Sequence, residues 1–264
     1  GDSGDVTFNY SLTDAPSVVP SGFNSLETLT IAAGQQATFE LTGAAGTPFL
    51  IDGLDTTDED LSIDFRGPDG TRLFTGIFPA SEQQDIPRAG PALLPESGTY
   101  TITLSGSTPT AAGSYTFRVL DLTNSSTPIQ IGDTVSSILT GGREAFVYSF
   151  NGTAGQLLRF DGLGGSGGRL RIYDRFLQTT FAVGAFDATP TTDGLFRITR
   201  SGIHYVVLIG ESNTPANIDF RVLDVDAAPL LAFGERVTGT LVVGRSAADF
   251  RINLEAGQRI RFES

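Results

Sequence analysis

The residues best suited to chemistry are the acids of the stretch DGLDTTDEDLSID, which runs from Asp52 to Asp64. Carboxylate oxygens are the ligands that Ca²⁺ prefers, and the ion takes about six to eight of them. The spacing differs from that of an EF-hand loop, which requires Gly at the sixth position and Glu at the twelfth. A solvated loop that adds charge and solubility is therefore the favoured interpretation, and no cofactor is assigned. The alternative is a Ca²⁺ site, for which Asp55, Asp58 and Asp60 are the candidate ligands.

Two further residues could suggest catalysis. The segment GGSGG, Gly164 to Gly168, has the G-x-S-x-G form of a hydrolase nucleophile elbow around Ser166, but that motif requires a strand entering a helix and both flanks here are typical of strands. His204 is the single histidine, and it falls where an earlier copy of the same segment has Tyr100. A Gly-rich turn and a packing role explain these residues, so we predict no catalytic residue and no enzyme.

The composition excludes several kinds of site. The chain has no Cys, Met, Trp or Lys, which rules out disulfides, thiolate metal sites and cysteine nucleophiles. The formal net charge of −13 repels nucleic acid and anionic membranes, and no apolar run is long enough to cross a bilayer. We predict neither nucleic-acid binding nor membrane insertion. An acidic chain without Cys favours a secreted, extracellular or cell-surface location.

An internal repeat organises the chain. FRVLDL at Phe117–Leu122 returns as FRVLDV at Phe220–Val225, 103 residues later, and SGTYTITLSG ending at Gly106 returns as SGIHYVVLIG ending at Gly210. A third copy begins near Phe233. Such self-similarity is the signature of tandem modules. We divide the chain into the end of a preceding repeat or a linker strand at 1–21, a first repeat at 22–126, a second repeat at 127–228 and the first part of a third repeat at 229–264.

Within one repeat, the pattern indicates strand after strand. The 32 Gly and 13 Pro residues separate short apolar or alternating runs, and no stretch is typical of a helix. Tyr100, Ile102 and Leu104 alternate with threonines, as a strand with one buried face requires. FRVLDL is partly apolar on both faces, which suits a strand at the contact between repeats. The strands expected in the second repeat lie near 133–139, 143–150, 156–162, 168–173, 178–183, 194–199, 202–209 and 217–224.

Together these patterns predict an all-β fold of tandem jelly-roll or Ig-like antiparallel β-sandwich modules, each of about 100 residues. The order of AGQLLRFDGL, LSIDFRGPDGTRLF, SGTYTITLSG and GSYTFRVLDL resembles the pre-peptidase C-terminal (PPC) family, in its tandem form in large secreted or surface proteins of cyanobacteria and other bacteria. The resemblance implies a sandwich without catalytic residues. The second copy departs from it at YDRFLQTT, where the first has GPDGTRLF, so we expect a differently shaped hairpin there.

From these features we predict a non-catalytic structural or adhesive module that forms a rod or an extracellular filament, with neighbouring repeats as its partners. The alternative is an accessory module of an exported enzyme that binds a polymer such as surface polysaccharide, although the absence of Trp and the 6 Tyr residues disfavour a sugar-stacking surface. Two explanations of the unfinished third copy stay open. Strands exchanged with another copy of the chain could complete it, or the sequence is a piece of a longer protein.

Overall fold

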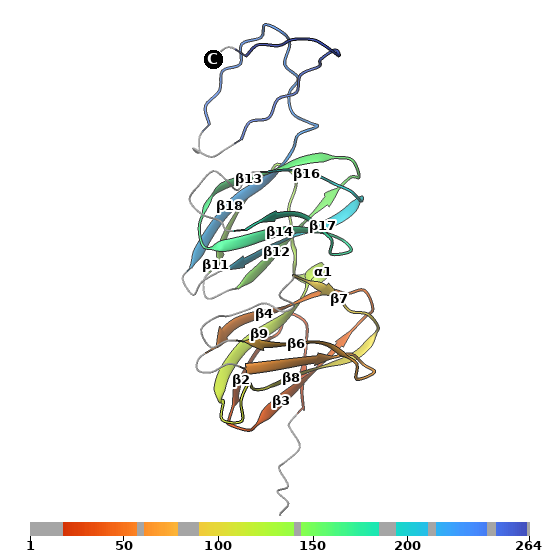
Figure 1. Cartoon of the computed structure of the whole chain (residues 1–264), viewed down its shortest axis with the longest axis vertical. Helices are drawn as coiled ribbons and strands as arrows, with labels where there is room; N and C mark the ends of the chain where they lie inside the picture. Colours follow the sequence, from red (N-terminus) through yellow and green to blue (C-terminus); the bar gives the residue numbers. More distant parts are fainter. Residues whose placement is uncertain are drawn as a thin grey trace, which may run out of the picture.

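A computed structural model of the chain describes residues 18–56, 61–78, 90–139, 144–184, 194–210, 215–241 and 247–262. Two β-sandwiches follow one another along the long axis of the molecule, and a third segment continues beyond the second (Figure 1). The all-β prediction is confirmed, since the strands of the described residues form largely antiparallel sheets and are accompanied by one short helical turn. None of them forms a helix that is long and apolar enough to cross a membrane.

The first sandwich consists of two sheets in the strand orders β1-β3-β8-β5-β6 and β2-β9-β4-β7. Its strands are β1 (Val18–Ser21), β2 (Leu26–Ile31), β3 (Gln36–Gly43), β4 (Pro48–Thr56), β5 (Leu61–Arg66), β6 (Arg72–Phe78), β7 (Ala92–Leu93), β8 (Gly98–Gly106) and β9 (Gly113–Asp121). β1 lies within the segment assigned above to a preceding repeat or linker, and it pairs in parallel with β3.

The second sandwich repeats this arrangement with the orders β10-β12-β17-β14-β15 and β11-β18-β13-β16. Its strands are β10 (Thr127–Pro128), β11 (Thr134–Leu139), β12 (Ala145–Gly152), β13 (Leu157–Gly165), β14 (Gly168–Asp174), β15 (Thr179–Val183), β16 (Gly194–Arg197), β17 (Gly202–Gly210) and β18 (Ala216–Asp224). Each of the eight strands expected in this repeat is present, and the ends differ by a few residues. The parallel pairing of β10 with β12 matches that of β1 with β3.

Alternation along each strand separates the core from the outer faces. In β8, Tyr100, Ile102 and Leu104 are fully buried, while the intervening threonines face outward. These three residues belong to the core of the first sandwich, and an equivalent core fills the second. The Tyr100 hydroxyl donates a 2.5 Å hydrogen bond to the Glu96 carbonyl, which satisfies the polar end of this buried ring.

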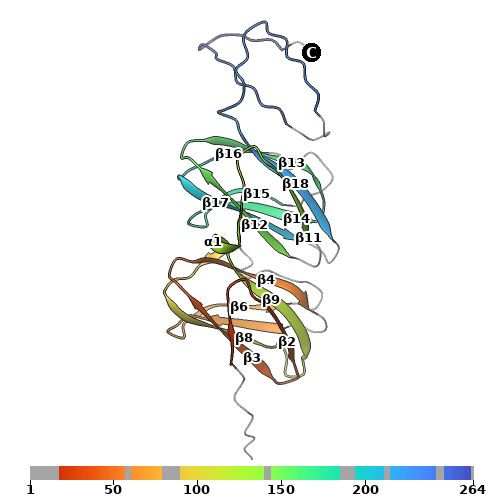
Figure 2. The same ribbon diagram turned by 180° about the vertical axis from the view of Figure 1, so that it is seen from behind.

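A short helix that the sequence did not predict joins the sandwiches. α1 (Leu122–Ser125) is a single turn, and Asp121 caps it by accepting a hydrogen bond from the Thr123 amide. It is too short to show helical periodicity in the sequence. Because α1 leads directly into β10, the connection between the sandwiches leaves little free chain (Figure 2).

The expectation of a differently shaped hairpin at YDRFLQTT is wrong. The Asp174 amide donates to the Gln178 carbonyl and the Leu177 amide to the Asp174 carbonyl, which matches the Gly67 to Thr71 and Gly70 to Gly67 bonds of the first sandwich. The turn requires a positive φ, which is 79° at Gly70 and 59° at Leu177. The backbone is therefore preserved although the residue at the left-handed position is not Gly.

The third segment follows the path of the start of the second sandwich. Leu230 bridges Arg251 in parallel, 102 residues after the Pro128–Ser149 pair, and the Leu231 amide donates to the Arg251 carbonyl as Ile129 does to Ser149. Four of the exposed apolar side chains of the segment have buried apolar counterparts in the second sandwich: Val237, Leu241, Ile260 and Phe262 correspond to Val135, Leu139, Leu158 and Phe160.

Candidate functional site at the junction of the sandwiches

The most developed site in the molecule is the contact between the two sandwiches. A separate cluster of buried, largely apolar side chains, here called the junction cluster, lies there. The first sandwich contributes three of them and the second contributes five: Leu50, Leu120 and Leu122, then Ala145, Val147, Tyr173, Tyr205 and Val207. The outer face of the β12–β17–β14 sheet therefore packs on the end of the first sandwich (Figure 1).

This contact explains why β17 is apolar on both faces and why Leu120, on the outer face of β9, is buried. In β17, Val206 and Leu208 belong to the core, and the alternating Tyr205 and Val207 belong to the junction cluster. A strand buried on both sides needs apolar residues at consecutive positions. The sequence-based prediction that FRVLDL lies where neighbouring repeats touch is confirmed by Leu120, which is buried in this cluster.

Leu177 also packs against the junction cluster. A left-handed backbone costs a residue with a side chain about 1 kcal/mol relative to Gly. A Gly at this position, such as Gly70 in the first sandwich, would avoid that cost and contribute no contact. The burial of the Leu177 side chain offsets the strain, so the junction accounts for the substitution in an otherwise preserved turn.

An ion pair fixes one side of the junction. Asp52 on β4 is fully buried, and its Oδ2 accepts a hydrogen bond of 2.8 Å from Nε of Arg118 on β9. The other carboxylate oxygen accepts 3.1 Å from the Ala145 amide of the second sandwich, and Arg118 Nη2 donates 3.0 Å to the Ala145 carbonyl. We call this arrangement, in which Asp52 and Arg118 hold both backbone groups of Ala145, the first clamp.

The first clamp supplies the hydrogen-bond partners that a neighbouring strand would otherwise give to Ala145. β10 pairs with β12 only at Tyr148 and Ser149, so among the described residues no strand pairs with the start of β12 on that side. A buried strand edge leaves amide and carbonyl groups that need partners. Asp52 and Arg118 supply one acceptor and one donor, and the buried carboxylate keeps its counter-ion. Because these hydrogen bonds are made to the backbone of Ala145, which is fixed within β12, the contact holds the two sandwiches in one relative position.

The same arrangement occurs a second time. Asp161 Oδ2 accepts 2.6 Å from Nε of Arg221, the Ala247 amide donates 3.1 Å to Asp161 Oδ1, and Arg221 Nη2 donates 2.9 Å to the Ala247 carbonyl. Asp161 is fully buried, like Asp52. This second clamp joins the end of the second sandwich to the third segment, so one device serves two successive junctions.

The candidate Ca²⁺ ligands are only partly covered by the structure. Asp55 lies on β4 opposite Thr116, while Asp58 and Asp60 lie outside the described residues. The described part of the chain contains no group of three or more His, Asp or Glu side chains that could hold a metal. Calcium binding by the loop stays the alternative interpretation.

Two acids of the same stretch, Asp52 and Asp64, form ion pairs with arginines. Asp52 belongs to the first clamp, and Asp64 on β5 pairs with Arg66 and Arg72 at 2.9 Å each. The hydrogen bond from Arg72, with that from Arg66, holds the pKa of Asp64 below its ordinary value because it favours the carboxylate.

Ser166 and His204 do not come together. Ser166 is exposed between β13 and β14, two residues before Gly168, which pairs with Gly210. His204 pairs with Asp174 at the other end of the same β14–β17 ladder. Six residue steps along a strand span about 20 Å, so these residues cannot share a proton.

His204 occupies a packing position. It is fully buried, it stacks on Phe150 with ring centroids 5.3 Å apart, and its Nδ1 lies 3.0 Å from the Gly202 carbonyl. Among the described residues, Nε2 has no hydrogen-bond partner. Burial lowers the pKa of His204 below its ordinary value, because the charged ring would lose its hydration.

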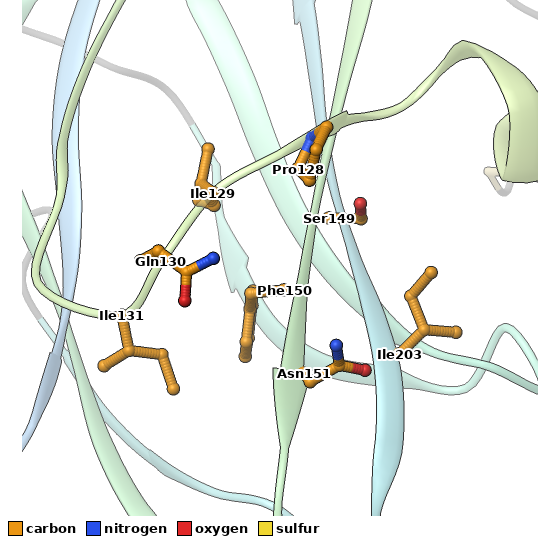
Figure 3. Close-up of a pocket in the computed structure, with 8 residues that line it drawn as sticks. All are labelled: Pro128, Ile129, Gln130, Ile131, Ser149, Phe150, Asn151 and Ile203. Atoms are coloured by element: carbon orange, nitrogen blue, oxygen red, sulfur yellow. The ribbon is translucent and has the colours of Figure 1, made fainter.

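A pocket of about 250 Å³ lies on the second sandwich, between the segment after β10 and strands β12 and β17 (Figure 3). Of the eight described residues that line it, none is charged: Pro128, Ile129, Gln130, Ile131, Ser149, Phe150, Asn151 and Ile203. Its mixed lining offers neither an acid–base pair nor an ion-pairing group, so the junction remains the better developed site.

The sequence-based analysis missed the clamps. Asp52 and Arg118 lie inside the repeated FLIDGL and FRVLDL segments, and both residue types return in the second copy as Asp161 and Arg221. The recurrence of this Asp and Arg pair in both copies was the sequence feature that could have indicated a conserved ion pair. Their partner could not be identified, because it is the backbone of another module and has no sequence pattern.

No protein-family model and no curated protein sequence matches this chain. Among solved structures, the pre-peptidase C-terminal domain of collagenase from Bacillus anthracis is similar at 18% identity and a TM-score of 0.33, over 37% of this chain and 93% of that chain. The periplasmic g-type lysozyme inhibitor PliG of Aeromonas hydrophila is similar at 16% identity and a TM-score of 0.29, over 37% of this chain and 96% of its own.

The CUB1-EGF-CUB2 region of human MASP-1/3 is similar at 9% identity and a TM-score of 0.24, over 75% of this chain and 100% of that chain. A domain of the family that the sequence resembles is thus among the similar structures. The TM-scores of 0.33, 0.29 and 0.24 are all below 0.5, so no argument about activity is based on these likenesses.

Proposed function

We propose that this chain is a non-catalytic structural module of a secreted or cell-surface protein, in which β-sandwiches stack in one fixed orientation as a stiff rod. The observation that carries the proposal is the repetition of the clamp: Asp52 and Asp161 make equivalent bonds to Arg118 and Arg221 and to the backbone of the following unit. A device repeated at successive junctions propagates one relative orientation along an array.

The junction cluster supports a stiff contact. Side chains such as Tyr173 and Tyr205 are buried between the sandwiches, and separating them would expose this surface to water. The short connection through α1 adds to the restraint. The extracellular location is part of the proposal and is supported by the acidic composition without Cys.

NMR relaxation of backbone ¹⁵N nuclei tests whether the sandwiches move as one body. We expect the amides of both sandwiches to fit a single elongated rotational tumbling model. In D52A the clamp loses its carboxylate and leaves Arg118 without its buried partner, so the two sandwiches should tumble more independently.

D64A is the matched control. Asp64 is also paired with arginines but lies on the outer face of the first sandwich, away from the junction. This variant should keep the single tumbling model. Independent tumbling of the unmodified chain, or an equal effect of D52A and D64A, would contradict the proposal.

A further inference from the structure

One equivalent pair of positions is apolar at the first junction and charged at the second. Leu50, two residues before Asp52, is replaced by Arg159 before Asp161, and Val147, two residues after Ala145, is replaced by Asp249 after Ala247. Both members of the first pair are buried in the junction cluster. An apolar pair at the first junction has therefore become a charged pair at the second.

The charged pair is formed with good geometry. Asp249 Oδ1 accepts 2.6 Å from Nη2 of Arg159, and Nε of Arg159 lies 2.9 Å from Oδ1 and 2.8 Å from Oδ2. The two side chains keep only 24% and 14% of their surface exposed. A bidentate pair that is shielded to this extent depends on both partners, because either charge alone would be left poorly solvated.

We propose that this pair is the specificity-determining contact that fixes which sandwich docks on which, and the proposal rests on the stacked arrangement proposed above. The end of the first sandwich, with Leu50, fits a partner that is apolar at the position of Val147. The end of the second sandwich, with Arg159, fits a partner with a carboxylate at the position of Asp249.

Mismatched docking is unfavourable in both directions. A partner with Val against Arg159 would remove the carboxylate to which Nε and Nη2 of the guanidinium donate, and a partner with Asp against Leu50 would bury a carboxylate against an apolar side chain. The clamps cannot discriminate between partner sandwiches, since they bind backbone amide and carbonyl groups that every partner has. The pair beside each clamp therefore supplies the repulsive element that specificity requires.

A double-mutant cycle in the full chain tests the pairing, with hydrogen exchange of the Ala247 amide as the readout. This amide donates to Asp161 and is protected only while the third segment is docked. We expect R159L and D249V each to accelerate its exchange at least about tenfold. In R159L/D249V, which recreates the apolar pair of the first junction, protection should return.

Salt sharpens the test, because it screens partly exposed charges. Raising the salt concentration from about 0.05 to 1 M should accelerate Ala247 exchange more in the unmodified chain than in R159L/D249V, which keeps only the Asp161–Arg221 ion pair of the second clamp. R236L, which removes an exposed Arg of the same segment, is the control for loss of one positive charge and should change exchange little. The reciprocal variant L50R/V147D should stay docked and make Ala145 exchange more sensitive to salt than it is in the unmodified chain.

The outcomes separate the two proposals. An Ala247 amide without any protection in the unmodified chain would contradict the clamped stack itself. A protected Ala247 amide that responds to neither single variant, or a double variant no better than the worse single one, would overturn the pairing and leave the stack intact.

Discussion

On the second sandwich, the outer face of the β12–β17 sheet carries Val147, Tyr205 and Val207, which are buried at the junction. The equivalent face of the first sandwich carries threonines instead. The cross-strand pair Val147–Val207 corresponds to Thr38–Thr103, whose hydroxyls are 3.1 Å apart. The two faces have the same strand order and register but opposite polarity.

The difference shows that folding and docking are encoded at alternate positions of the same strands. Inward residues such as Ile102 and Val206 are apolar in both copies and build the core. Outward residues change freely, because a sandwich needs only one apolar face per sheet. A single strand can therefore acquire a docking surface without a change in its fold, and the variants below test this separation.

The largest expected effect comes from giving the second sandwich the outer residues of the first. Y205T/V207T removes an aromatic and a branched side chain from the junction cluster, and we expect a loss of about 3–5 kcal/mol in the free energy of unfolding. Urea denaturation should show two separate transitions in place of a coupled one. Unchanged denaturation would mean that the junction cluster contributes nothing.

The close approach of Gly90 in the first sandwich to Tyr173 in the second allows the junction to be tested from the first sandwich. Gly90 of the first sandwich is buried with φ of 115°, and a Cβ there would lie 2.1 Å from the Tyr173 hydroxyl. G90A should therefore cost about 2 kcal/mol through overlap and backbone strain. G46A has a positive φ of 80° but no neighbour within 4 Å, so it measures the strain alone. Equal losses in thermal unfolding would deny the contact with Tyr173.

The stability of the two sandwiches should depend differently on pH, and this effect should be smaller than the two above. Because burial keeps the folded-state pKa of His204 below its ordinary 6.5, the unfolded chain takes up the proton first as the pH falls. The second sandwich should keep its full stability above pH 6.5 and lose stability below it. The first sandwich has Tyr100 at this position and should not respond in that range.

H204F isolates this contribution. Phe preserves the stack on Phe150 and has no titrating group, so the loss of stability between about pH 7 and 5 should disappear. Denaturation midpoints at several pH values measure it. A pH dependence that persists in H204F would assign the titration to another group.

The smallest expected effect is on the polar face. T103V places the residue type of Val207 on the first sandwich, where the side chain stays partly exposed, and we expect a change within about 0.5 kcal/mol. Thermal denaturation measures it. A large loss would show that the threonine pairs are needed for folding, and the two faces would then not be independent.

The sequence allowed the strands and the core to be predicted, because alternation and Gly or Pro boundaries act locally. It also indicated that FRVLDL contacts a neighbouring repeat, since both of its faces are partly apolar. The clamp at Ala145 could not be predicted, because a buried Asp such as Asp52 can serve many partners and only the packed structure shows which backbone it meets. The prediction for the hairpin at Leu177 was wrong for a related reason. Leu177 packs against the junction cluster, and this contact between sandwiches is not visible in the local sequence.

The most direct test of the stacked arrangement is a distance distribution between spin labels on the two sandwiches. The chain has no native Cys, so labels can be attached at T30C and S136C, two exposed strand positions on β2 and β11. We expect pulsed electron paramagnetic resonance to give one narrow distance, unchanged by dilution. A broad or multiple distribution from a chain in which both sandwiches remain folded would contradict a fixed junction.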